Sequence, residues 1–127
     1  MVRRTGCWLW NSNPQPNETV TWSGACPRGP AEGQGSGEWR SQDGGAPPVV
    51  SRFSGQMREG RLDGQASVTW PHGNRYEGEW RDDRADGQGA HFIAAEQRWY
   101  RGAWFSGCHL GPGGARASIA RPLSSCP

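Results

Sequence analysis

The sequence contains no lysine, and all 14 basic residues are arginine. Arginines and acidic residues are interleaved along the chain, which leaves a formal net charge of only +2. A protein that binds nucleic acid needs a concentrated basic patch, and this pattern does not provide one. We therefore expect no nucleic-acid partner. Membrane association stays open, but the charge pattern gives it no support.

Apolar residues are also scarce. They make up 33% of the chain, whereas about 45–50% is usual for a globular domain. No apolar run approaches the ~20 residues of a membrane helix. The length of 127 residues suits one domain. A thin sheet with one aromatic face fits this composition better than a thick core, because the eight tryptophans supply a large apolar area.

The sequence lacks the short motifs that would indicate an enzyme active site or a metal site. The chain has no Gly-x-Ser-x-Gly sequence and no Cys-x-x-Cys pair, so a nucleophile elbow and a zinc site are unsupported. The Gly87-Gln88-Gly89 fragment does not lead into a predicted helix, which argues against a phosphate-binding loop. We expect no cofactor and no metal.

A repeated frame organises what is present. Residues 75–89 read Tyr-x-Gly-x-Trp, then a polar turn, then Gly-x-Gly. The same frame, with glycine two and eleven residues after the aromatic, begins at four positions: Trp22, Phe53, Tyr76 and Tyr100. Self-similarity at this spacing is typical of a repeat array, in which each unit buries its apolar face against its neighbours.

This frame resembles the membrane occupation and recognition nexus (MORN) repeat over roughly residues 20–113. The opening stretch, from Gly6 through Cys26, also resembles the start of exported bacterial members of that family. The resemblance implies β-hairpin units and a general role as an interaction scaffold. A scaffold of this kind does not name its ligand.

We therefore expect an all-β protein, a single-layer twisted antiparallel sheet of consecutive β-hairpins within one repeat domain, 1–127. Residues 1–19 and 114–127 are expected to cap the array, and residues 41–50 to form an inserted loop. Within the second repeat the pattern predicts a turn over residues 60–64 and a return strand over 66–70. In the third repeat Asp83 replaces the turn glycine, since aspartate tolerates a left-handed conformation better than most residues.

Four cysteines lie near the two ends of the chain. An even count with one pair near each end favours two disulfides, Cys7–Cys26 and Cys108–Cys126. The alternative is four reduced thiols in a cytosolic protein. Disulfides would indicate an oxidising compartment. We expect a periplasmic or secreted protein, and no signal peptide is apparent at Met1.

Alternation along the strands predicts an aromatic spine. Tyr76, Gly78 and Trp80 should share one face, with Glu77 and Glu79 on the other. Stacking the repeats aligns the candidate ligand-binding residues Trp22, Phe53, Tyr76, Trp80, Tyr100 and Trp104. These rings would line a groove for an apolar segment, a sugar or a cation. The alternative is that they pack on each other as the core.

Acid–base chemistry has weaker candidates. His91 and His109 lie in a predicted strand and turn, and either would need a nearby carboxylate such as Glu79 for general acid–base work. Paired carboxylates such as Asp82 and Asp83 are more typical of solvated ion pairs than of a glycosidase or cation site. No catalytic residue is assigned, and the balance leans against an enzyme.

The sequence thus favours a non-enzymatic interaction module that presents the aromatic groove to a protein or peptide segment. The alternatives are a module that binds a carbohydrate or a lipid headgroup, and a small enzyme that uses His91 or His109. A homodimer is also compatible, because one aromatic face of a single layer needs cover.

Overall fold

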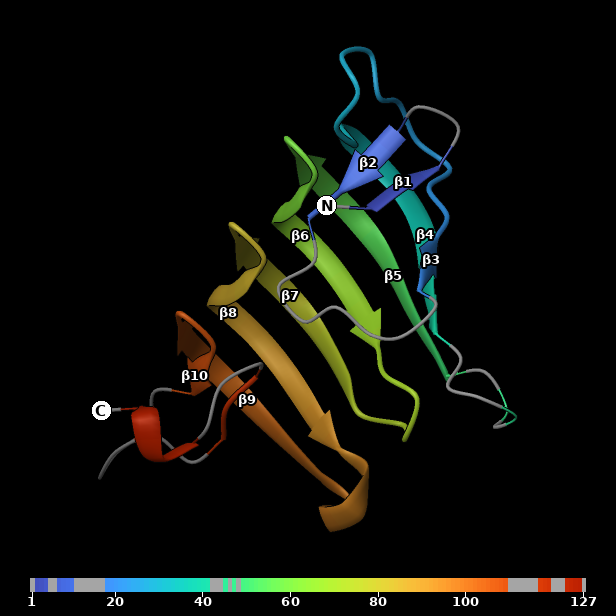
Figure 1. Ribbon diagram of the computed structural model, residues 1–127. Helices are drawn as coiled ribbons and strands as arrows, with labels where there is room; N and C mark the ends of the chain where they lie inside the picture. The colour runs from blue at the N-terminus through green and yellow to red at the C-terminus, as the bar shows by residue number, and fades with distance from the viewer. Residues whose placement is uncertain are drawn as a thin grey trace.

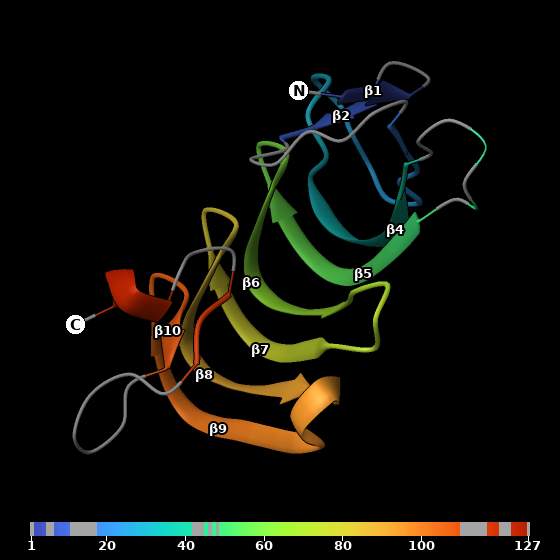
Figure 2. The same ribbon diagram turned by 60° about the horizontal axis from the view of Figure 1, so that its bottom comes forward.

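Eight strands form one open antiparallel sheet in the order β10-β9-β8-β7-β6-β5-β4-β3, so strands that follow each other in sequence are also neighbours. The computed structural model describes residues 2–4, 7–10, 18–41, 45, 47, 49–109, 117–119 and 123–126. The strands curl strongly along their length, and short segments lie at both ends of the array (Figures 1 and 2). The predicted all-β, single-sheet fold of consecutive hairpins is confirmed.

The strands of the large sheet are β3 (Thr19–Val20), β4 (Gly33–Ser41), β5 (Val49–Arg58), β6 (Arg61–Thr69), β7 (Arg75–Arg81), β8 (Arg84–Ile93), β9 (Arg98–Phe105) and β10 (Cys108–His109). A separate pair, β1 (Val2–Arg4) and β2 (Cys7–Leu9), forms a two-stranded sheet. Two short 3-10 helices, η1 (Ala94–Glu96) and η2 (Leu123–Ser125), complete the described elements. Strand β5 begins within the expected loop 41–50, so that insertion is shorter than predicted.

Two-residue turns close three of the hairpins. Both residues of each turn have positive φ, as in type I′ turns, and they are Glu59-Gly60, Asp82-Asp83 and Ser106-Gly107. The expected turn over residues 60–64 is therefore wrong, because β6 already begins at Arg61. The predicted turn role of Asp83 is confirmed by its φ of 68°.

Gly64, expected in the turn, instead lies in a β-bulge, and Gly87 lies in an equivalent bulge. Pairing slips between Gly78 and Trp80, where the three residues Asp86-Gly87-Gln88 oppose Glu79 alone. The φ of Gly87 is 107°, and a Cβ there would lie 2.3 Å from the Glu79 carboxylate. That carboxylate accepts the backbone N–H of Gln88. The same slip occurs between β5 and β6, at Asp63-Gly64-Gln65.

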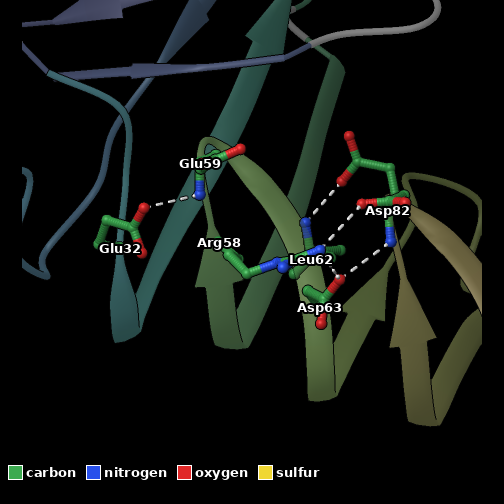
Figure 3. A network of polar contacts seen from close by, with 7 residues as sticks. Glu32, Arg58, Glu59, Leu62, Asp63 and Asp82 are labelled. Carbon is green, nitrogen blue, oxygen red and sulfur yellow. Dashed lines mark hydrogen bonds and ion pairs between the residues drawn. The ribbon is translucent and has the colours of Figure 1, made fainter.

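An acid-Gly-Gln triplet, which lies in a bulge in β6 and β8, holds the turn of the next hairpin. The acidic side chain accepts a backbone N–H from the first turn residue: Glu32 from Glu59 at 2.9 Å, Asp63 from Asp82 at 3.4 Å, and Asp86 from Ser106 at 3.2 Å. Figure 3 shows the first two of these contacts, with Arg58 bridging Asp63 and Asp82. We call this repeated arrangement the acidic clamp.

A backbone bond supports each acidic clamp. The residue before the acid accepts the N–H of the second turn residue: Ala31 from Gly60 at 3.0 Å, Leu62 from Asp83 at 2.9 Å, and Ala85 from Gly107 at 2.8 Å. Successive hairpins are therefore joined at their turns as well as along their strands. In the sequence of the fourth repeat, Leu110 stands where the others have an acid.

The core is the aromatic face of the sheet. The Tyr76 ring lies over the backbone at Gly89, where a Cβ would come within 2.0 Å of its hydroxyl, and that hydroxyl donates to the Glu79 carbonyl at 3.1 Å. The Trp80 indole N–H donates to the Ala66 carbonyl at 3.2 Å. Glycine is needed beneath the rings because a side chain there would lift them off the sheet.

The described N-terminal residues, Cys7 to Trp10, lie against the turns of the first two hairpins. Cys7 and Cys26 are joined by a disulfide with Cα atoms 5.5 Å apart. The Trp8 N–H donates to the Gly29 carbonyl and the Trp10 N–H to the Gly60 carbonyl, both at 2.9 Å. Leu9 adds a buried side chain to the core.

The C-terminal segment closes the other end. The second disulfide joins Cys108 and Cys126, with Cα atoms 5.8 Å apart. The His109 N–H donates to the Ala117 carbonyl at 2.9 Å, and the Ile119 N–H donates to the Gly107 carbonyl at 2.8 Å. Residues 110–116, which follow β10 in the fourth repeat, lie outside the described residues.

Candidate functional site

The aromatic spine is packed into the core. Five of the six candidate rings are nearly inaccessible: Phe53, Tyr76, Trp80, Tyr100 and Trp104 are 0–8% exposed. Tyr76 meets Trp80 and Trp104 edge-on, with ring centroids 5.2 and 5.5 Å apart. Trp22 is half-buried and stacks on Phe53 at 6.1 Å. These rings therefore pack against one another in the core.

His91 lies inside this core at 4% exposure. Its ring sits between Trp70 and Trp104, with centroids 5.9 and 5.7 Å away. Burial lowers the pKa of His91 from 6.5 to about 4, and the charge of Glu96 opposes that shift. His91 is therefore neutral at pH 7. Its Nδ1 atom has no hydrogen-bond partner among the described residues.

The structure separates the candidate histidines from the candidate carboxylates. His91 stands opposite Tyr76 in the sheet register, whereas Glu79 lies on the other face and binds the Gln88 N–H. His109 is also buried, and its Nε2 atom lies 2.9 Å from the Arg101 carbonyl. No His–Glu pair forms from these residues, because strand alternation sends their side chains to opposite faces.

The paired carboxylates lie at turns and in ion pairs. Asp82 pairs with Arg58 at 3.8 Å, and Glu77 pairs with Arg75. Burial raises the pKa of Asp83 to about 6, although the Leu62 N–H donates to its carboxylate at 2.7 Å and opposes the shift. Within the described ranges, no three His, Cys, Asp or Glu side chains are placed to hold a metal ion.

The face opposite the aromatic core, here called the polar face, carries a groove of about 590 Å³. It spans β4, β5, β6 and the edge segment beside β4. Its lining residues are Thr21, Trp22, Ser23, Ser36, Gly37, Glu38, Arg52, Phe53, Ser54, Ser67 and Thr69. Six of these eleven residues bear a hydroxyl group. The Glu38 carboxylate accepts the Arg52 Nε–H at 3.0 Å and pairs with Arg40 at 3.6 Å.

Register aligns these side chains in two rows across the strands. The serine row runs Ser36, Ser54, Ser67, Glu77, Ala90 and Arg101, and the arginine row runs Glu38, Arg52, Thr69, Arg75, Phe92 and Trp99. Sequence reasoning did not identify these serines, Arg52 or Trp99. The detectable signal was serine or threonine at alternate positions of successive predicted strands, a period-two pattern on the face opposite the aromatics.

No helix in the described part of the chain has the length and apolarity needed to cross a membrane. The two disulfides favour an oxidising environment. Comparison of the sequence with models of known protein families and with curated proteins finds no match.

Proposed function

We propose that this chain is a non-enzymatic interaction module of the MORN-repeat type, periplasmic or secreted, that binds its partner on the polar face. The observation that carries the proposal is the open groove over β4, β5 and β6, which is lined by hydroxyls and by the Arg52–Glu38 pair. The aromatic groove expected from the sequence is an unsuitable docking surface, because its rings are packed in the core.

The side chains that line the groove support binding rather than catalysis. Serine and threonine hydroxyls donate and accept hydrogen bonds but need an adjacent base to become nucleophiles. The histidines lie on the other face or in the exposed turn at His72. The Glu38 carboxylate is shared by two arginines, Arg40 and Arg52.

The proposal can be tested with a variant whose side chain fills the groove, because such a variant should lose binding. Ser54→Tyr places a large side chain at an exposed strand position in the groove, and Arg81→Tyr places the same side chain on the polar face outside the groove lining. Calorimetric titration would use synthetic peptides, neutral and acidic oligosaccharides, and inositol phosphates as probes. Mass spectrometry would follow the chemical state of each probe.

The proposal expects at least one probe to bind the wild type and Arg81→Tyr, to lose most of its affinity for Ser54→Tyr, and to be recovered unchanged. Chemical conversion of a bound probe would instead indicate an enzyme. Binding that Ser54→Tyr leaves intact would move the site away from the groove. Thermal unfolding of both variants checks that each is folded.

A further inference from the structure

The arginine row and the serine row continue past the groove to the far side of the sheet. They cross β4 through β9, and five steps between neighbouring strands span about 24 Å. Hydroxyls occupy the first half of this path, at Ser36, Ser54 and Ser67. The second half ends at Trp99 and Arg101 on β9. A ligand that follows both rows would therefore be extended and would lie across the strands.

At the β9 end of the rows, two arginine side chains lie against the Trp99 ring. The guanidinium groups of Arg75 and Arg101 lie 5.7 and 4.7 Å from the Trp99 ring centroid, and Phe92 packs beside the ring at 5.1 Å. Stacking uses the flat face of a guanidinium and leaves its N–H donors at the edge. Two restrained guanidinium groups of this kind suit carboxylates, which accept bidentate hydrogen bonds.

The charge balance of the path is positive. The two rows carry three guanidinium groups, Arg52, Arg75 and Arg101, and two carboxylates, Glu38 and Glu77. Arg101 has no carboxylate partner among the described residues. This formal excess of one positive charge favours a ligand that carries negative charges. A membrane surface would need a denser cluster, of about four to eight basic residues.

The hydroxyl groups of the groove further restrict the class of ligand that it can bind. A protein segment is anchored mainly by aromatic or arginine side chains that fill desolvated pockets, whereas this groove is open and six of its eleven lining residues bear hydroxyl groups. A chain of sugars presents hydroxyls along its whole length and matches such a lining. Carboxylates on that chain would meet Arg52, Arg75 and Arg101.

We infer that the two rows bind an extended acidic polysaccharide built from uronic-acid units, lying across β4 to β9. The inference rests on the proposed binding function and names its ligand class. Serine hydroxyls hydrogen-bond the sugar hydroxyls, and the arginines hold the carboxylates. Trp99 positions Arg75 and Arg101, so its loss weakens binding without removing a charge.

The experiment titrates the intact protein with an oligomer of galacturonic acid and with a neutral oligosaccharide of equal length. Arg101→Gln is expected to weaken uronate binding by roughly tenfold or more, because a hydrogen bond to a charged group is lost. Trp99→Ala should also weaken it, and Arg101→Lys should fall between wild type and Arg101→Gln. Affinity for the uronate should decrease as salt concentration rises.

The chain supplies a matched control pair on the N-terminal side. Arg61 stacks on exposed Trp10 at 5.0 Å, away from both rows. Arg61→Gln and Trp10→Ala remove the same chemistry and should bind the uronate like the wild type. The inference would be overturned if these controls lost as much affinity for the uronate as Arg101→Gln and Trp99→Ala do. It would also be overturned if the wild type bound the neutral oligosaccharide as tightly as the uronate.

Two further outcomes separate this inference from the proposed function. If peptides or vesicles of phosphatidylglycerol bind in a groove-dependent way while the uronate does not, the ligand class is wrong and the module proposal stands. If the uronate is bound and cleaved, the non-enzymatic proposal fails. Thermal unfolding of each variant excludes loss of fold as the cause of weak binding.

Discussion

At residue scale, the core depends on close contact between aromatic rings and bare backbone. Tyr76 is fully buried although it belongs to a single-layer sheet, because its ring lies over Gly89 and is covered by Trp80 and Trp104. Trp22 covers Gly24 and Gly35 in the same way. The small apolar content is thus sufficient, since a few large rings cover a whole face.

His91 gives a prediction at this scale. Its pKa is lowered from 6.5 to about 4 by burial, so the unfolded chain takes up a proton before the folded protein does. Stability from this residue is complete above pH 6.5 and is lost as pH falls toward 4. The wild type should lose up to about 1.4 kcal/mol per pH unit relative to His91→Phe in this window.

Urea unfolding of both proteins between pH 4 and 7 measures this difference. Asp83 has the opposite sign, since its raised pKa favours folding at low pH, but it is present in both proteins and cancels. His72→Gln, in an exposed turn, serves as the control and should keep the wild-type profile. If the unfolding free energies of wild type and His91→Phe ran parallel with pH, folding would not lower the pKa of His91, and the prediction would be wrong.

At element scale, the hairpins are joined by the acidic clamps as well as by their ladders. The clamp recurs because an acid-Gly-Gln triplet, which lies in a bulge in the second and third copies, places an acid next to the following turn, where two N–H groups at positive φ need acceptors. The sequence shows the repeat as Glu32-Gly33-Gln34, Asp63-Gly64-Gln65 and Asp86-Gly87-Gln88. In the sequence of the fourth copy, Leu110 stands in place of the acid.

The first clamp can be tested by removing its acceptor. Glu32→Ala should cost about 1 kcal/mol of unfolding free energy and speed hydrogen exchange at the Glu59 amide, because that N–H loses its partner. Glu32→Gln keeps a carbonyl acceptor and should retain most of both. Gln34→Ala, at an exposed position of the same strand, is the control. An unchanged Glu59 exchange rate in Glu32→Ala would rule the clamp out.

At the scale of the whole molecule, the sheet does not close on itself, and a disulfide holds a short segment against each end of it. The linked cysteines are 19 and 18 residues apart in sequence. The segments they hold add Leu9, Ala117 and Ile119 to the core, at the places where a central hairpin would have a neighbour. Terminal units of a repeat array need this cover.

Removing either disulfide should destabilise the protein by about 3 kcal/mol in the chain-entropy model. The double variants Cys7→Ser with Cys26→Ser, and Cys108→Ser with Cys126→Ser, would be compared by urea unfolding. Hydrogen exchange should accelerate first in the strands beside the affected cap and last in β6 and β7. Equal acceleration in every strand would mean that the caps hold the entire sheet together.

The hairpin array, the aromatic face and the pairing of the cysteines could all be predicted from the sequence. Strand alternation and the repeat frame are local properties, so they are sufficient to assign Tyr76 and Trp80 to one face of the sheet. The position of the turns was predicted less well. Glycine marks a bulge as readily as a turn, and the pairing register was needed to show that Gly64 and Gly87 lie within strands.

Which face is accessible depended on the tertiary structure. The sequence could not distinguish an aromatic groove from an aromatic core, because that depends on how far the sheet curls and where the caps lie. It also could not bring Ser36, Ser54 and Ser67 into one row, or place Trp99 between Arg75 and Arg101. These contacts join residues far apart in the chain, and their register is set by bulges and turns acting together.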